Sequence, residues 1–80
     1  MDEMELINSP LEQQVTRDGL TVAICIYRGA DEEGWLLEVE DHEGGSTVWE
    51  DRFETDQAAL NEAMKVIETN GIRSLTASQR

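Results

Sequence analysis

Asp18 and Gly19 lie between two segments of alternating hydrophobic character, in the stretch VTRDGLTVAICIY, and they constrain the fold more than any other residues. An Asp-Gly pair suits a two-residue type I′ turn, because both central residues of that turn adopt positive φ angles. Side chains alternate across a strand, so this turn collects every second residue of the flanking strands on one face. Five apolar residues fall on this face: Leu11, Val15, Val22, Ile24 and Ile26. The sequence therefore predicts an antiparallel hairpin with one buried face.

The beginning of the first strand has two interpretations. Pairing across the turn places Val15 opposite Val22 and Leu11 opposite Ile26, which extends the strand back to Leu11. The letters SPLE at Ser9–Glu12 also fit a capping box with proline at the first helical position, so a helical turn is the alternative. We favour the strand because its register agrees with that of its partner.

The stretch WLLEVEDHEGGSTVWEDRF predicts a second hairpin. A three-residue loop at Glu43–Gly45 ends in glycine, which suits the left-handed position of such loops. This loop pairs Val39 with Trp49 and Trp35 with Phe53, so both tryptophans lie on the buried face. A two-residue loop would instead place Trp35 beside an arginine, and burial therefore favours the longer loop.

A helix is predicted after the second hairpin. Thr55 can cap its first turn, and Asp56 is favourable there because the amino end of a helix carries partial positive charge. Asn70-Gly71 ends the pattern in the way that glycine commonly ends helices. The apolar stripe has helical spacing and consists of Leu60, Ala63, Met64 and Ile67.

These elements predict an α+β fold, in which a four-stranded antiparallel meander sheet carries one C-terminal helix on one face (ββββα). We expect a single domain over residues 11–73. It is preceded by an N-terminal arm, residues 1–10, whose order the sequence leaves open, and followed by a tail, residues 74–80. The letters RSLTASQR are expected to begin as a short strand. A chain of 80 residues has a thin core, so we also expect it to form a homodimer.

Composition limits the partners and the location of the chain. Eighteen acidic residues against six basic ones give a formal net charge of −12, which repels phosphate and anionic lipid and attracts basic protein surfaces. The acidic start MDEMEL does not resemble a secretory signal, and no apolar run is long enough to cross a bilayer. The single cysteine forms no internal disulfide. We therefore expect a cytoplasmic protein that does not bind membranes.

The sheet face opposite the helix is the candidate interaction surface. No predicted element covers it, although it carries apolar residues beside carboxylates. The predicted register also places Glu38 opposite Glu50, a like-charge pair that a purely structural sheet would avoid. The alternative is that these acids only keep a small domain in solution. The candidate residues are Tyr27, Leu36, Glu38, Glu40, Asp41, Glu43, Val48, Glu50 and Asp51.

We expect no metal, no cofactor and no catalytic residue. The letters EDHEGGS lack the ligand spacing of the best-known calcium loop, and His42 and its two acidic neighbours point in different directions on a strand end. Cys25, in mid-strand, is not placed to pair with a histidine in a turn. Paired carboxylates such as Glu38 and Glu50 need a cleft that raises one pKa, and a flat sheet offers none.

Four strands followed by a helix, over residues 11–70, resemble the unit of the single-stranded-DNA-binding transcriptional coactivators and Whirly proteins. That resemblance implies stacking of bases on exposed aromatic residues. Those proteins present basic faces, however, and phosphate binding depends on Lys and Arg contacts. The basic residues here are only Arg17, Arg28, Arg52, Lys65, Arg73 and Arg80. A single-stranded nucleic-acid-binding module is therefore the alternative function.

The letters GW before a strand, followed by FETDQAALNEAMKVI, resemble small bacterial hairpin-then-helix proteins, including the HicB-type antitoxins and several uncharacterised families. The resemblance covers Gly34–Gly71 and implies a small regulatory module that occupies a basic partner. Our leading hypothesis is therefore a non-enzymatic, acidic, homodimeric interaction module of a bacterial type.

Overall fold

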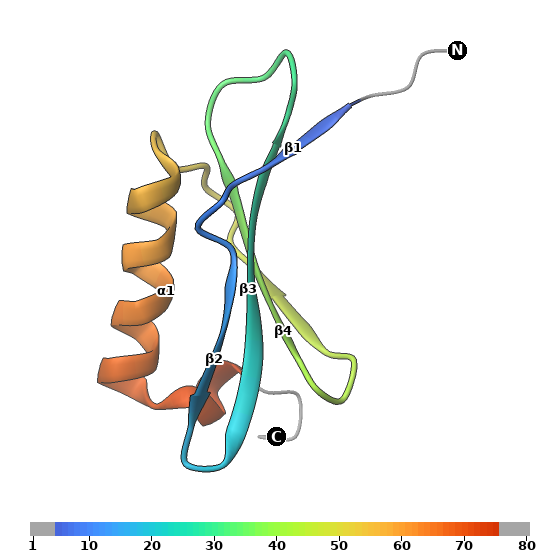
Figure 1. Cartoon of the computed structure of the whole chain (residues 1–80). Helices are drawn as coiled ribbons and strands as arrows, with labels where there is room; N and C mark the ends of the chain where they lie inside the picture. Colours follow the sequence, from blue (N-terminus) through green and yellow to red (C-terminus); the bar gives the residue numbers. More distant parts are fainter. Residues whose placement is uncertain (1–4, 76–80) are drawn as a thin grey trace.

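The computed structural model describes residues 5–75 and contains one antiparallel sheet with a helix packed on it (Figure 1). The α+β prediction is confirmed, but the sheet has five strands, because the N-terminal segment contributes one. The elements in chain order are β1 (Leu6–Asn8), β2 (Gln13–Arg17), β3 (Leu20–Gly29), β4 (Leu36–Asp41), β5 (Ser46–Val48), the helix α1 (Asp56–Asn70) and a 3-10 turn, η1 (Ile72–Leu75).

Strand β3 is the centre of the sheet. It pairs with β4 on one side and with both β1 and β2 on the other, and β5 lies outside β4. The hairpin between β2 and β3 is the one predicted: Asp18 and Gly19 have φ angles of 55° and 78°, and Val15 lies opposite Val22. The turn chemistry therefore fixed this register correctly.

The prediction that the first strand reaches back to Leu11 is wrong. Ser9–Glu12 forms a turn, in which the Leu11 N–H donates to Ser9 Oγ at 2.9 Å and the Glu12 N–H donates to the Ser9 carbonyl at 3.2 Å. Leu11 therefore has no strand partner at Ile26. Proline at position 10 has no N–H to give to a sheet, and its fixed φ suits a turn.

Side chains of this turn connect the sheet and the helix. The Ile26 N–H, which would have bonded to a continuous neighbouring strand, donates to Glu12 Oε2 at 2.9 Å. Ser9, only 3% exposed, donates from Oγ to Asp56 Oδ2 at 2.8 Å, in the first turn of α1. Polar side chains thus satisfy the backbone where β1 and β2 separate.

The second hairpin has the predicted loop length, but the loop lies one residue earlier, at 42–44. The Asp41 N–H donates to the Gly45 carbonyl at 2.9 Å, and Gly44, with φ of 92°, takes the left-handed position. As a result Glu38 lies opposite Val48, and the predicted pair of Glu38 with Glu50 is wrong. Val39 lies opposite Thr47 rather than Trp49 for the same reason.

The predicted bridge between Trp35 and Phe53 is nevertheless confirmed. The backbone N–H of Trp49 donates to the Leu37 carbonyl at 3.1 Å, so Trp49 pairs with Leu37. Between this pair and the pair of Trp35 with Phe53, one residue of the first strand, Leu36, lies opposite three residues of the second, 50–52. The two extra residues form a bend, and β5 ends at Val48 instead of continuing to Phe53. A local bulge of this kind restores the register farther along the strand.

The helix begins and ends where the sequence predicts. Thr55 Oγ1 accepts the Ala58 N–H at 3.0 Å, and Gly71, with φ of 88°, donates its N–H to the Ile67 carbonyl at 3.0 Å. Residues after the helix form η1 rather than the expected short strand, and Ile72 and Leu75 are buried there. The remainder of the predicted tail, residues 76–80, lies outside the described residues.

The core lies between α1 and the sheet. Both tryptophans pack against it on this side, partly buried, and Trp49 Nε1 donates to Glu62 Oε2 of α1 at 3.3 Å. The sheet is therefore amphipathic, as predicted. The buried core residues are Val15, Val22, Ile24, Ile26, Leu37, Val39, Ala59, Ala63, Ile67, Ile72 and Leu75.

Candidate interaction surface

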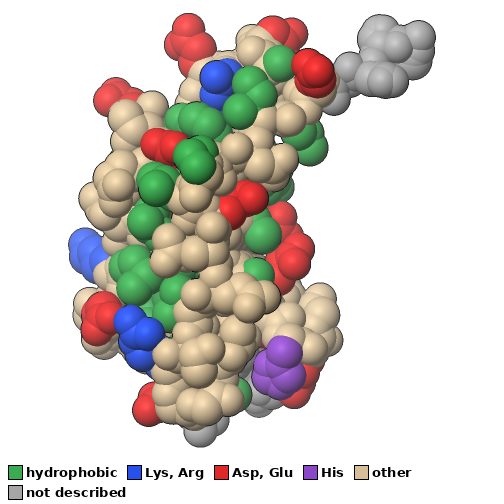
Figure 2. All heavy atoms as spheres, viewed as in Figure 1, with side chains coloured by type: hydrophobic (Ala, Val, Ile, Leu, Met, Phe, Trp, Pro, Cys, Tyr) green, Lys and Arg blue, Asp and Glu red, His purple; other side chains and the backbone are tan. Residues whose placement is uncertain are grey.

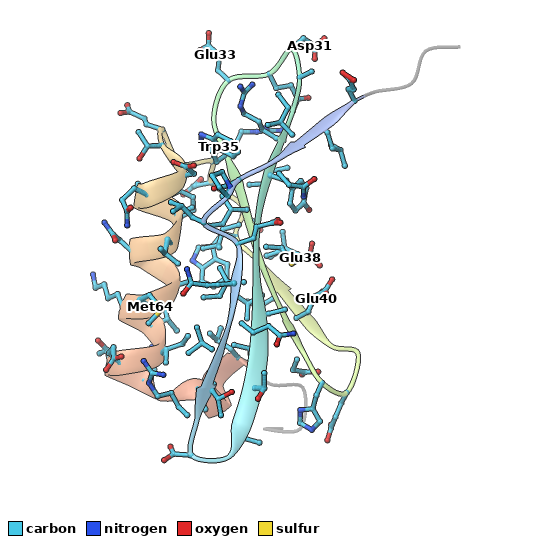
Figure 3. All side chains as sticks on the ribbon, viewed as in Figure 1. Asp31, Glu33, Trp35, Glu38, Glu40 and Met64 are labelled. Carbon is cyan, nitrogen blue, oxygen red and sulfur yellow. The ribbon has the colours of Figure 1, made fainter. Side chains whose placement is uncertain are left out.

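We use the term open face for the side of the sheet that faces away from α1. In Figure 3, Glu38 and Glu40 project from β4 on this side, whereas Met64 belongs to the helix on the other. Side chains alternate along each strand, so the register identifies the other residues that share the face. The open face consists of Leu6, Asn8, Gln14, Thr16, Thr21, Ala23, Cys25, Tyr27, Leu36, Glu38, Glu40, Ser46 and Val48.

The centre of the open face is an apolar strip, formed by Tyr27, Leu36 and Val48, beside the carboxylate of Glu38. Tyr27 lies opposite Leu36, and Glu38 lies between Cys25 on β3 and Val48 on β5. Tyr27 Oη donates to Glu38 Oε1 at 3.1 Å, which holds that carboxylate against the strip. Val48 is 54% exposed, and none of the described elements packs over it. The strip therefore offers apolar area next to a positioned negative charge.

Five of the nine predicted site residues share this face: Tyr27, Leu36, Glu38, Glu40 and Val48. Glu43 lies instead in the hairpin loop, with Oε2 at 3.5 Å from His42 Nε2. Glu50 and Asp51 are exposed in the bend after β5. The structure thus separates these predicted residues into three groups: those on the sheet face, Glu43 in the hairpin loop, and Glu50 and Asp51 in the bend after β5.

Asp41 does not lie on the open face. It faces the helix side, is only 7% exposed, and accepts the N–H groups of Glu43 at 2.8 Å and Gly45 at 2.9 Å with Oδ1. A carboxylate that accepts backbone N–H groups in this way organises a turn. Asp41 therefore belongs to the structure of the loop rather than to a binding surface.

Leu6 is an open-face residue that the sequence reasoning did not select. It lies opposite Gly29 at the end of the strip and is 59% exposed. The apolar letters before Ser9 were a signal for it, but no strand could be assigned there from periodicity alone. Leu6 extends the apolar strip from β5 across to β1.

Three arginines, Arg17, Arg28 and Arg52, are engaged with other side chains. Arg17 contacts Glu68 at 3.3 Å and Arg52 contacts Glu32 at 3.1 Å, while Arg28 lies 5.1 Å from the centre of the Trp35 ring. Figure 2 shows few Lys and Arg side chains among many carboxylates on the side of the molecule in view. The open face, as defined by its residues, carries carboxylates without a compensating cation.

The hollows on the described surface include the following two. One, of about 490 Å³, is lined by Glu33, Gly34, Arg52, Phe53 and Glu54. The other, of about 130 Å³, lies beside Glu40 and His42 and includes Thr21 and Ala23. Neither of these two hollows contains Glu38 or Glu50, the carboxylates that the sequence paired.

Burial and the surrounding carboxylates raise two pKa values on the open face. The pKa of the Cys25 thiol rises through burial and through the negative charges of Glu40, Glu12 and Glu38. The pKa of Tyr27 rises through burial and through its hydrogen bond to Glu38. Both groups are therefore held in their neutral forms, which is consistent with a negative potential over the strip.

These shifts predict a loss of stability in alkali. A group whose pKa is raised by folding stabilises the folded state fully below its usual pKa, and this contribution disappears as the pH rises through the raised value. We expect the free energy of unfolding to fall above pH 9.0, the usual pKa of the thiol, and further above 10.0, that of the phenol. Urea denaturation across this range measures it. The double variant C25S/Y27F should show a shallower decline, and an equally steep one would contradict the assignment.

Within the described part of the chain, no helix is both long and apolar enough to cross a membrane. No group of three or more His, Cys, Asp or Glu side chains among those residues could hold a metal ion. A scan against protein-family models and searches of curated proteins and of solved structures found no match to this chain. A proposal for function therefore rests on the geometry and charge of the open face.

Proposed function

We propose that this protein is a non-enzymatic interaction module that binds a basic protein surface through its open face. The observation that carries the proposal is the apolar strip of Tyr27, Leu36 and Val48, which no described element covers and which lies beside Glu38 and Glu40. Apolar area at the centre of an interface supplies affinity, and charges around it supply orientation and rate of encounter.

The charge of the face favours a basic protein over a nucleic acid. Neutralisation of phosphates by Lys and Arg supplies most of the affinity of nucleic-acid-binding proteins. Glu38 and Glu40 on the face, and a net charge of −12 on the whole chain, would repel a phosphate backbone. The single-stranded nucleic-acid-binding alternative would therefore require a different surface.

Self-association is the second property that we propose, and salt separates it from partner binding. A homodimer formed through two open faces would bring Glu38 and Glu40 of each copy near those of the other. Salt screens this repulsion and should strengthen such a dimer, whereas it should weaken an attraction between opposite charges. Light scattering at low and high salt measures the first effect, and binding assays measure the second.

Affinity capture from the native cell lysate tests the proposal. The variant E38K/E40K should lose most of the proteins that the wild type retains, because it reverses the charge of the open face. The matched control E33K/E54K changes the net charge by the same amount at exposed positions elsewhere. Bound proteins should be basic and should elute with salt. Equal loss in both variants would show that only net charge matters and would contradict a specific surface.

A further inference from the structure

The outer edge of β5 has no neighbouring strand among the described residues, because β5 is the last strand in the order β1-β3-β4-β5. Backbone groups at such an edge are free to pair with another chain. The backbone N–H of Trp49 donates to the Leu37 carbonyl. The backbone groups of Thr47, two residues earlier, therefore also point toward β4, where Thr47 pairs with Val39. In an antiparallel ladder the alternate residues face outward. The N–H and C=O groups of Ser46 and Val48 therefore point away from β4.

The same two residues are the open-face residues of β5. Val48 offers an exposed apolar side chain, while Ser46 is small and lies opposite Glu40. A strand added beside β5 would lie about 10 Å from β4, two strand spacings away. A lysine or arginine next to Ser46 could extend over its short side chain to Glu40, and an apolar residue two positions away would pack on Val48.

Both ends of β5 are acidic. Glu43 lies in the loop before it, and Glu50 and Asp51 lie in the bend after it, all exposed. The other edge of the sheet, along β2, also has acidic neighbours, Glu12 and Asp18, but it ends in Arg17. The carboxylate of Glu12 already accepts the Ile26 N–H. The exposed acidic residues at both ends of β5, with no basic residue in the strand, therefore favour a basic segment at this edge.

A second copy of this chain fits the edge poorly. Antiparallel pairing of two β5 strands about Thr47 would bring the acidic loop of one copy, with Glu43, toward the acidic bend of the other, with Glu50 and Asp51, at both ends of the contact. Like charges brought close together repel one another and destabilise such a contact. The charge pattern therefore selects a basic partner rather than a symmetric dimer at this edge.

We infer that the partner binds as an extended basic segment that adds a strand to the outer edge of β5, with a basic residue next to Ser46 and an apolar residue next to Val48. This inference rests on the proposed function and specifies its mode. Main-chain hydrogen bonds supply affinity in strand addition, and alternate side chains supply specificity. Because β5 has only three residues, the affinity depends strongly on the side-chain contacts.

A short, capped peptide of alternating lysine and valine is the probe. Its control has the same sequence with methyl groups on alternate backbone nitrogens of one edge, which keeps the charge but removes the donors that strand addition needs. We expect the parent peptide to bind about tenfold more tightly than the methylated one, a loss typical of one or two missing hydrogen bonds. Amide shifts in NMR spectra should be largest at Gly45–Trp49. Equal binding of both peptides would overturn the inference.

Protein variants provide a second test. V48P removes an outward N–H without breaking a bond to β4 and should weaken the parent peptide about tenfold, whereas V48T keeps the donor and should have a smaller effect. E40Q keeps the backbone intact and should weaken binding if the basic residue extends to Glu40. Unchanged binding in V48P and E40Q would overturn the edge inference. Equal binding of both peptides, with shifts at Tyr27 and Leu36 instead, would do the same and leave the proposed open-face function standing; no binding at all, with no capture from lysate, would end both.

Discussion

Replacing Leu37 with alanine is expected to lower the free energy of unfolding by about 2–5 kcal/mol. Leu37 is 0% exposed and lies between the sheet and α1, so its truncation leaves a cavity that the surroundings fill only partly. Small domains have a total stability of about 5–15 kcal/mol, and this change therefore removes a large share of it. Urea denaturation followed by tryptophan fluorescence measures the loss.

Leu36 provides the matched control for Leu37. It is the preceding residue of β4, but its side chain lies on the open face and is only partly buried. The same substitution there should cost less than about 1.5 kcal/mol, because no enclosed cavity is created. L36A should instead weaken capture of the partner. If the two variants were equally destabilised, the sheet would not have one buried and one open face.

Replacing Glu12 with alanine is expected to cost about 1–3 kcal/mol, although glutamate is usually a replaceable surface residue. Its carboxylate accepts the Ile26 N–H at 2.9 Å, and no neighbouring strand replaces that acceptor. E12Q keeps an oxygen acceptor and should lose less. E5A removes an exposed carboxylate from the same region and should change little. Urea denaturation, with exchange of the Ile26 amide hydrogen, measures the effect; an amide as protected in E12A as in the wild type would contradict the assigned bond.

The sequence was informative wherever a local signal determines the backbone. Asp18-Gly19 set the register of the first hairpin, and Thr55 and Gly71 set the two ends of the helix. Each of these residues acts on its own segment through a φ angle or a cap, without help from distant parts of the chain. The hydrophobic alternation in β3 and β4 then identified the core face.

The errors arose where a polar side chain competes for backbone hydrogen bonds. Ser9 and Glu12 satisfy groups that a longer β2 would have used, and Asp41 accepts two N–H groups of the second loop, which lies one residue earlier than predicted. Such local bonds to the backbone compete with regular secondary structure, and composition alone does not reveal which will form. The strand β1 was missed for a different reason. Its pairing depends on β3, more than a dozen residues away, and all its side chains are exposed, so it shows no hydrophobic alternation.

The candidate surface was predicted where alternation alone decides it. Tyr27, Leu36 and Val48 were correctly assigned to one face by their position along the strands. Asp41 was included for its charge, although counting by two from Val39 puts it on the helix side. Periodicity was therefore the better guide than charge in this strand.

Two separate strands, β1 and β2, pair with the same side of β3, so the sheet has a break along this side between Asn8 and Gln13. β1 buries none of its side chains, and the chain is already bent away from β3 between Ser9 and Glu12. A local fluctuation that separates β1 from β3 can thus expose the backbone at one end of β3, while β2, the helix and the core keep their structure. The molecule can expose backbone there briefly and reversibly, at far less than the cost of global unfolding.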